Sequence, residues 1–364
     1  MTRSRASRAF FGNCLCCEPP AAVSRRGFVA GGVAAVGAGL LAASGFAPKA
    51  VAQAQPHRID VHHHISPPTW LDAVKKVKLD NPPLTNWSVQ KSLDDMDKAG
   101  IATSITSPTT PQVGFLGKEE AARVARESND YATKLMSDHP GRFGVFAMLP
   151  LPHIDESLKE IEYAFDTLKV DGIGTMTSYG DKWLGYPQFA PVWEELNRRK
   201  ATVYTHPTGA NCCVNLVQGI NEATIEFGTD TTRTIASLIF SGTSQRYNDI
   251  NFIFSHGGGV LTAVAERFQV QMVSTPPYKD KFTRQSVDAE LKRFYYDTAQ
   301  ISNAVTIEAL AKLVAVSQIV YGTDYPYRTG ADHVKGLTTA FKPDDLKAID
   351  RDNALRLLPR LRTA

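Results

Sequence analysis

Short β-branched or apolar runs alternate with helical stretches along the chain from residue 58 to residue 358. Eight of these runs have the length and composition of buried strands: residues 58–64, 101–107, 143–149, 172–177, 202–206, 251–256, 294–298 and 318–323. No linker rich in Pro, Gly or Ser divides them, and no repeat is visible. Because strand–helix–strand crossovers are right-handed, eight such units predict a single α/β domain, a (β/α)8 TIM barrel.

Start and stop signals support the helices between these strands. Ser88 precedes an apolar pattern at Leu93, Met96 and Ala99, and Gly100 ends it. Further helices are predicted at residues 119–138, 155–168 and 343–358. A doubly wound open sheet is the alternative architecture, but it requires a Gly-rich loop after the first strand, where this chain has a run of three histidines.

The N-terminus has the pattern of a twin-arginine signal peptide. Arg25 and Arg26 precede an apolar segment rich in Gly and Ala, and Ala52 and Ala54 give the small-x-small pattern of a cleavage site. We therefore expect cleavage of residues 1–54 and one mature domain at residues 55–364, carried by the twin-arginine export machinery to a periplasmic or secreted location. The alternative is an uncleaved membrane helix, but the segment is short, so no stable membrane insertion is expected after processing.

The charge balance excludes some partners. Without the six basic and one acidic residues of positions 1–54, the balance of 40 basic to 37 acidic residues becomes 34 to 36. No basic excess then remains to indicate binding of nucleic acid. The mature chain keeps only Cys212 and Cys213, and we expect no structural disulfide because adjacent cysteines bridge only with strain.

Residues with metal-binding chemistry stand at the ends of four predicted strands. His62 and His64 end the first strand and project to the same side, whereas His63 must point toward the helix layer. His206 ends the fifth strand, and His256 ends the sixth. The eighth is followed by Asp324, in a turn flanked by Gly and Pro.

A single histidine after a strand is more often a hydrogen-bonded structural residue than a ligand. Here five of the nine histidines lie at or beside predicted strand ends, which is where TIM barrels carry their active sites. Three neutral imidazoles and one carboxylate suit zinc or another divalent transition metal. The pattern as a whole therefore predicts a metal site.

These motifs resemble the amidohydrolase superfamily, and within it the branch with aminocarboxymuconate-semialdehyde, resorcylate and methylsalicylate decarboxylases. The resemblance covers nearly the whole mature chain. It includes Asp94-Asp95-Met96-Asp97-Lys98-Ala99-Gly100 before the second strand and Pro140-Gly141-Arg142-Phe143 before the third. The segment from Leu184-Gly185 to Asn197, followed by His206-Pro207, looks most like the methylsalicylate decarboxylases.

The resemblance implies a role for each strand-end residue. His62, His64, His206 and Asp324 would be metal ligands, with His256 a catalytic residue beside the metal and Asp324 also catalytic. We expect a single divalent ion, because the end of the fourth strand lacks the lysine that bridges two metals in other members. Zinc is the first expectation for this ion and manganese the second. The resemblance also implies a homodimer.

The site is compatible with two reactions, since a metal can serve decarboxylation and hydrolysis. The leading hypothesis is a metal-dependent, non-oxidative decarboxylase of a hydroxybenzoate-like aromatic acid such as 6-methylsalicylate, in which a protonated His256 or Asp324 protonates the ring carbon. The alternative is a hydrolase of a lactone, ester or amide, with Asp324 as base and His256 stabilising the oxyanion. A solute-binding protein without catalysis is a third possibility.

Aromatic side chains in or near the strand-end loops are candidate contacts for a flat substrate, although core packing explains each one equally well. They are Trp70, Phe115, Tyr179, Trp183, Tyr325 and Tyr327. Arg267 and Arg328 are candidates for a second carboxylate. Asp297 is expected to orient a pocket residue rather than bind metal, and the glycines at 257–259 to allow close approach of backbone to the metal pocket.

Overall fold

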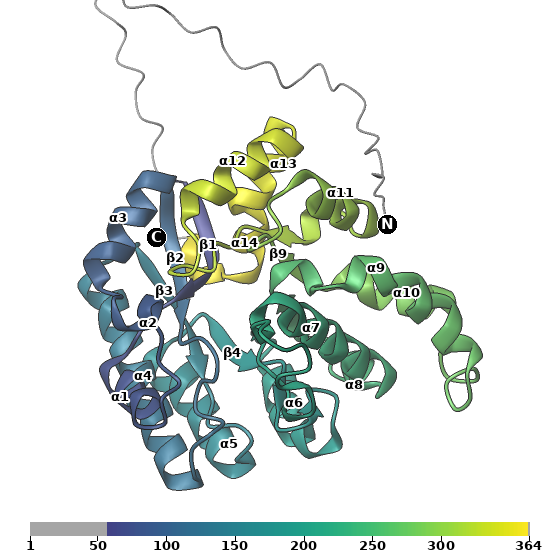
Figure 1. Ribbon diagram of the computed structural model, residues 1–364, viewed down its shortest axis with the longest axis horizontal. Helices are drawn as coiled ribbons and strands as arrows, with labels where there is room; N and C mark the ends of the chain where they lie inside the picture. Colours follow the sequence, from purple (N-terminus) through teal and green to yellow (C-terminus); the bar gives the residue numbers. More distant parts are fainter. Residues whose placement is uncertain (1–56, 363–364) are drawn as a thin grey trace, which may run out of the picture. The chain divides into compact units, whose positions relative to one another are not determined.

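The computed structural model describes residues 57–362, and its central feature is a ring of eight parallel strands with helices around it (Figure 1). Neighbouring strands pair in the order β1-β2-β3-β4-β7-β8-β9-β10. The strands are β1 (Arg58–His64), β2 (Ile101–Ser107), β3 (Phe143–Met148), β4 (Gly172–Met176), β7 (Thr202–His206), β8 (Asn251–Phe254), β9 (Tyr295–Asp297) and β10 (Ile319–Val320). This arrangement confirms the predicted (β/α)8 barrel.

Backbone hydrogen bonds between the first strand and the segment after the last strand close the ring. Val61 N donates to Tyr321 O at 3.0 Å, and His64 N donates to Tyr325 O at 2.8 Å. Asp324 N donates to His62 O at 2.8 Å between these two bonds. The closure therefore brings Asp324 beside the histidines of β1, although the two lie far apart in the sequence.

Helices cover the outer face of the strands and bury the larger of the apolar clusters against them. The helices are α1 (Pro68–Lys76), α2 (Pro82–Thr85), α3 (Val89–Ala99), α4 (Lys118–Asp138), α5 (Ile154–Tyr163), α6 (Ala190–Arg198), α7 (Glu222–Phe240), α8 (Thr243–Arg246), α9 (Leu261–Glu266), α10 (Arg284–Arg293), α11 (Ala304–Leu313), α12 (Gly330–Ala340), α13 (Pro343–Lys347) and α14 (Asn353–Leu357). A small hairpin, β5 (Ser178–Tyr179) and β6 (Lys182–Trp183), follows β4.

A second apolar cluster fills the inside of the barrel. It contains Val61, Phe146 and Tyr204 from three strands, together with Leu358 and Leu361 from the end of the chain. The C-terminal segment therefore packs against the barrel interior, and the strand ends that carry the histidines are left for a site.

The predicted elements agree with the structure, apart from several ends. The strands at 58–64, 101–107 and 202–206 have the predicted bounds, and α3 begins after Ser88 and ends at Gly100, whose φ is 65°. The predicted helix at 343–358 is instead divided into α13, a π-helical turn (Ala348–Asp352) and α14. A π-helical turn (Ala164–Leu168) likewise ends the helix predicted at 155–168.

The glycine run after β8 allows a close approach, but of helix α7 rather than of the metal pocket. A Cβ on Gly259 would lie 1.9 Å from Gly228 O in α7, and the φ of Gly259 is 70°. A Cβ on Gly258 would lie 2.9 Å from the ring of Tyr296. Glycine is therefore required where α7 crosses the turn that carries His256.

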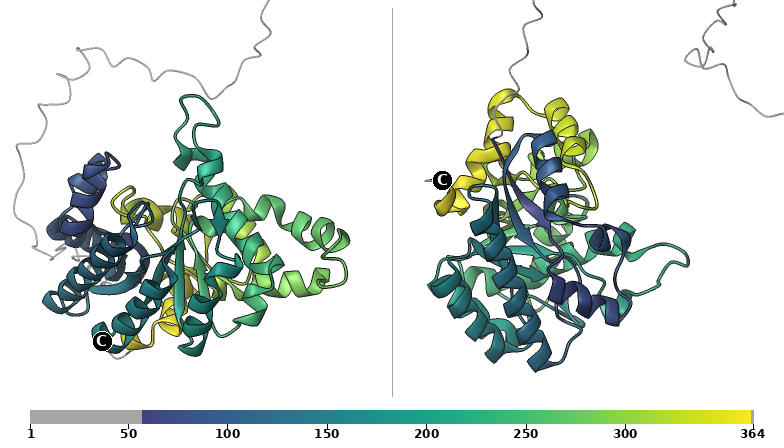
Figure 2. Two further views of the ribbon diagram at one scale, coloured as in Figure 1. Left: turned by 90° about the horizontal axis from the view of Figure 1, so that it is seen from below. Right: turned by 90° about the vertical axis from the view of Figure 1, so that its left-hand side faces the viewer.

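Two segments project from the barrel on the same side in both views of Figure 2: the α1–α2 region and the segment between β7 and α7. The expected signal peptide, residues 1–54, lies outside the described residues, as does its expected cleavage site. Within residues 57–362, no helix is long and apolar enough to span a membrane.

Candidate metal centre and active site

The barrel brings together the five strand-end residues that the sequence singled out. His62 and His64 point inward from β1, His206 ends β7, His256 follows β8, and Asp324 follows β10. All five side chains are buried or nearly so. His63 points to the opposite side, where its Nε2 lies 2.9 Å from Ser92 Oγ in α3, as expected for the helix layer.

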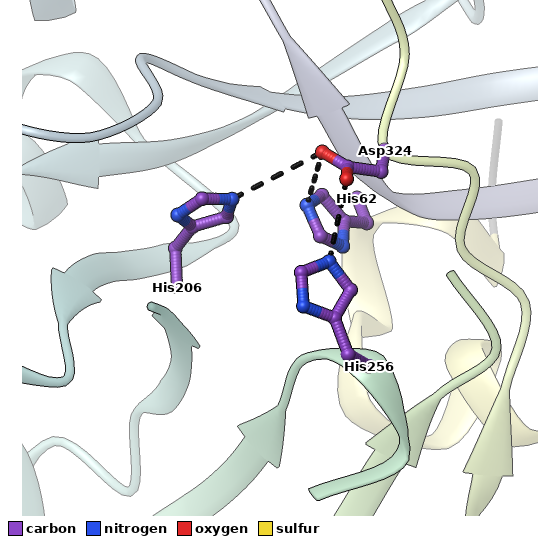
Figure 3. A group of neighbouring side chains, drawn as sticks. All are labelled: His62, His206, His256 and Asp324. Carbon is purple, nitrogen blue, oxygen red and sulfur yellow. Dashed lines mark hydrogen bonds and ion pairs between the residues drawn. The ribbon is translucent and has the colours of Figure 1, made fainter. Parts of the chain in front are cut away.

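The carboxylate of Asp324 lies at the centre of this group (Figure 3). Its Oδ1 is 3.1 Å from the Nε2 atoms of both His62 and His64 and 4.0 Å from that of His206. Its Oδ2 is 3.3 Å from His256 Nε2. Donor atoms of His62, His206, His256 and Asp324 all lie within 4.8 Å of one another. His64 is not in that group of four, but its Nε2 lies 3.1 Å from His62 Nε2 and 3.1 Å from Asp324 Oδ1.

The outer nitrogens of three of these rings are held by acceptors. His62 Nδ1 lies 2.8 Å from Asp297 Oδ2, His64 Nδ1 lies 3.2 Å from Ser107 O, and His206 Nδ1 lies 2.8 Å from Pro207 O. Each Nδ1–H can therefore donate outward, which leaves the lone pair of Nε2 facing the centre. This arrangement is typical of metal-binding histidines, so the donor set fits a divalent ion.

His256 differs from these three rings. Among residues 57–362, none holds its Nδ1 by a hydrogen bond, although its Nε2 faces Asp324. Its backbone N instead donates to Asp297 Oδ1 at 2.8 Å. The ring of His256 is therefore less constrained than those of the other histidines, which favours a catalytic role over a ligand role even though its Nε2 could reach a metal.

The carboxylates of Asp297 and Asp324 favour positive charge at this site. Burial alone lowers the pKa of His62, but the negative charges of Asp297 and Asp324 raise it to about 10. Burial lowers the pKa of His206 to about 3 and also lowers that of His64, so both rings are neutral with a free lone pair. Although burial opposes ionisation, the neighbouring imidazoles hold the pKa of Asp324 well below its usual range.

Two of the site residues have an unusual backbone conformation. The φ of His256 is 53° and that of Asp324 is 62°, in the left-handed region that few non-glycine residues adopt and in which Asn, Asp and His are the commonest of them. Hydrogen bonds from Asp324 N to His62 O and from Tyr327 N to Asp324 O hold this turn. Strain of this kind is concentrated at functional sites, where the surrounding structure enforces it.

A cavity of about 880 Å³ opens beside His206, His256 and Asp324. Its wall includes Phe227 from α7, whose ring centroid lies 6.4 Å from that of His206. Gln300 also lines it and donates from Nε2 to Asp324 Oδ2 at 2.8 Å. The cavity gives a small molecule access to the centre of the donor group.

Four aromatic residues predicted as substrate contacts lie away from this cavity. Trp70 is fully buried and donates to a backbone carbonyl, and Phe115 packs against the same cluster. The hydroxyl of buried Tyr179 accepts a backbone N–H at 3.0 Å, and Trp183 donates to a buried carboxylate at 2.6 Å. Core and hairpin contacts therefore account for these four side chains.

The other predicted contacts also lie outside the lining, apart from Tyr327. Tyr325 stacks on His63 at 4.7 Å between ring centroids, on the side facing the helices. Arg267 is exposed. Arg328 donates to Gln300 Oε1 at 3.4 Å and so lies behind a lining residue, while Tyr327 lines the cavity itself.

Sequence reasoning missed most of the cavity wall. Gln300 follows the seventh strand closely, so the rule that strand ends carry the site could have found it. Phe227 and Ile225 lie on α7 after a long segment without regular pattern, and no sequence signal placed them at the site.

Comparison with known proteins agrees with this geometry. Residues 59–360 match the model of a protein family described as amidohydrolase. The chain belongs to the amidohydrolase family. This confirms the resemblance expected from the strand-end motifs.

Several similar family members are decarboxylases by name. The chain is 36% identical over 330 residues to "Decarboxylase yanB" of Aspergillus niger, covering 83% of this chain and 88% of that protein. It is 32% identical over 319 residues to a 6-methylsalicylic acid decarboxylase of Penicillium expansum, covering 84% and 97%.

A solved structure shares the fold at low identity. It is a dihydroxybenzoic acid decarboxylase of Polaromonas sp. JS666 with bound manganese and the inhibitor 2-nitroresorcinol. Its TM-score is 0.76 at 20% identity, with 85% of this chain and 98% of that chain covered. At this identity the likeness shows the barrel fold.

Proposed function

We propose that this amidohydrolase-family protein is a metal-dependent, non-oxidative decarboxylase of a hydroxybenzoate-like acid such as 6-methylsalicylate. The observation that carries the proposal is that the Nε2 atoms of His62, His64 and His206 all lie within 4.0 Å of Asp324 Oδ1, at the end of a cavity large enough for an aromatic acid. The names of relatives above 30% identity favour decarboxylation over hydrolysis.

We assign the metal to His62, His64, His206 and Asp324, with one divalent ion per chain. A bound ion would supply a Lewis acid for the carboxylate and adjacent phenolate oxygens of the substrate. Zinc suits three imidazoles and a carboxylate, and manganese occupies the related structure. Metal analysis of protein purified without added metal distinguishes the two.

His256 is the proton donor in this proposal. Decarboxylation breaks the bond between the ring and the carboxylate, carbon dioxide leaves, and the ring carbon takes up one proton. Asp324 is a poor source of that proton, because Oδ2 accepts from Gln300 Nε2 and Oδ1 faces the Nε2 atoms of His62 and His64. His256 lines the cavity, and its imidazole can carry a proton to the substrate.

A substrate panel tests the reaction. Metal-loaded protein is incubated with hydroxybenzoates and, separately, with lactones and aryl esters, while carbon dioxide release and proton release are followed in parallel. We expect carbon dioxide from at least one hydroxybenzoate. Turnover of an ester or lactone with no carbon dioxide from any acid would overturn the proposal in favour of a hydrolase.

We also propose that residues 1–54 direct twin-arginine export and that the mature protein is a periplasmic or secreted homodimer. The paired arginines and the Ala52-x-Ala54 pattern support export. Fractionation of cells that express the full chain, beside an Arg25→Lys/Arg26→Lys variant, tests it. Light scattering of the mature protein tests the dimer.

A further inference from the structure

The lining of the cavity carries little positive charge. Among the described residues that form it there is no lysine or arginine, and its ionisable members are His206, His256, Asp324 and the phenol of Tyr327. Arg328 lies behind Gln300 and pairs with Asp332 at 3.9 Å. A second carboxylate on a bound acid would therefore lose its hydration without gaining a cation.

One wall of the cavity is apolar from the donor group outward. Phe227 contacts His206 edge-on at 6.4 Å between ring centroids. Ile225 on α7 and Val260, just before α9, also line the cavity, and they are 45% and 39% exposed. Ile301 lines the cavity as well. Apolar lining residues therefore lie both beside the candidate active site and at solvent-exposed positions of the cavity.

The cavity is large for a single ring with small substituents. Its volume of about 880 Å³ lies near the upper end of the range of roughly 300–1,000 Å³ seen for pockets that enclose drug-sized ligands. A ring held by its carboxylate at the donor group would leave the outer, apolar part of the cavity unfilled.

We infer that the substrate is a hydroxybenzoic acid with one carboxylate and an alkyl chain longer than methyl, which lies along Phe227, Ile225 and Val260. This inference rests on the proposed decarboxylation and names its substrate class. The carboxylate is held at the donor group, and the chain extends along the apolar wall toward solvent.

A chain-length series tests the inference. Steady-state kinetics are measured with the 6-methyl, 6-propyl and 6-pentyl salicylates and with a 6-alkyl salicylate that ends in a second carboxylate. From methyl to pentyl we expect kcat/KM to rise at least about tenfold, since each methylene that leaves water favours binding. The dicarboxylate should be turned over at least about tenfold less well than the pentyl compound, because its second charge is unpaired.

A variant and a matched control test where the alkyl chain of the substrate binds. In Val260→Lys, kcat/KM for the pentyl substrate divided by kcat/KM for the methyl substrate should fall to about one. The ratio depends on burial of the alkyl chain against an apolar surface, which the lysine disrupts. Val305 is 82% exposed at the start of α11, outside the cavity lining, so Val305→Lys should leave the ratio as in the unmodified protein.

The outcomes separate this inference from the proposed function. No carbon dioxide from any salicylate would overturn the proposed function. Turnover of the methyl compound without a gain for longer chains, or a gain that survives Val260→Lys, would overturn the substrate class alone. A change in oligomeric state with Val260→Lys and no change in the ratio would also overturn it, because the wall would then be covered by a second copy.

Discussion

Asp297 contacts both the candidate metal ligand His62 and the backbone of His256. Its Oδ2 lies 2.8 Å from His62 Nδ1 and accepts from Tyr204 Oη at 3.2 Å, while Oδ1 accepts from His256 N. Asp297 therefore holds both the ring of His62, a predicted ligand, and the backbone turn that carries His256, the predicted proton donor. The sequence predicted such an orienting role for it.

Asp297→Asn is predicted to weaken metal binding by about 10–100-fold, because an amide cannot accept the His62 Nδ1–H and all its other bonds equally well. Competition titration with a chelator measures the affinity, and the far-ultraviolet circular dichroism of the variant serves as the control for folding. Unchanged affinity in a folded variant would show that His62 does not depend on this contact.

His256→Asn is predicted to keep one metal per chain and to lose turnover by at least about 100-fold, the usual contribution of a general acid. Asparagine is chosen because it tolerates the positive φ at this position. Metal content and kcat are measured on the same sample, beside His62→Ala, which should lose the metal. Loss of metal from His256→Asn would make His256 a ligand instead.

At the scale of elements, the contact between α7 and the turn after β8 positions both the cavity wall and His256. Gly259→Ala is predicted to destabilise the fold, since the added Cβ meets Gly228 O at 1.9 Å in addition to the cost of a positive φ. Gly141→Ala is the matched control, because its φ is 78° and no atom lies within 4 Å of the added Cβ.

Urea unfolding of the two variants separates the two costs. Gly141→Ala should lose about 1–2 kcal/mol, the cost of a left-handed alanine, and Gly259→Ala should lose clearly more. Equal losses would mean that α7 can move away from the turn without penalty.

The strands were predictable because both faces of each are covered, which makes continuous apolar runs such as β3, where every residue is buried. The five strand-end residues followed from the same rule. The strands at 251–256 and 318–323 end earlier than predicted, since the chain turns before His256 and Asp324 to bring their side chains to the centre.

The cavity wall could not be predicted in the same way. Trp70 and Ile225 are both apolar residues on helices near the barrel mouth, but only the packing of each helix decides that one is buried in the core and the other faces the cavity. Hydrophobic periodicity identifies an apolar face without naming what that face contacts.

At the scale of the whole molecule, the C-terminal segment packs against the barrel at the end opposite the candidate active site. Arg360 makes two hydrogen bonds to Asp171, at 2.9 and 2.8 Å, just before β4. Asp171 is almost fully buried and also accepts from Val145 N. This pair ties the C-terminal segment to the N-terminal ends of the central strands.

Arg360→Ala is predicted to lower the free energy of unfolding by about 2 kcal/mol, because it leaves a buried carboxylate without its cation; the half-exposed guanidinium keeps the loss below that of a fully buried pair. Arg362→Ala is the control, since Arg362 is exposed and contacts only backbone carbonyls. Turnover at low temperature should be unchanged in Arg360→Ala. If Arg360→Ala lost as much turnover as His256→Asn, the Arg360–Asp171 pair and the candidate active site would not be independent of each other.

Metal held by His62, His64, His206 and Asp324 should be required for decarboxylation. The most direct test treats 6-methylsalicylate with chelator-stripped protein, with the same protein after one equivalent of metal, and with His62→Ala. We predict carbon dioxide and 3-methylphenol in equal amounts from the reloaded protein and neither from the other two. Equal turnover by stripped protein or by His62→Ala would contradict the account.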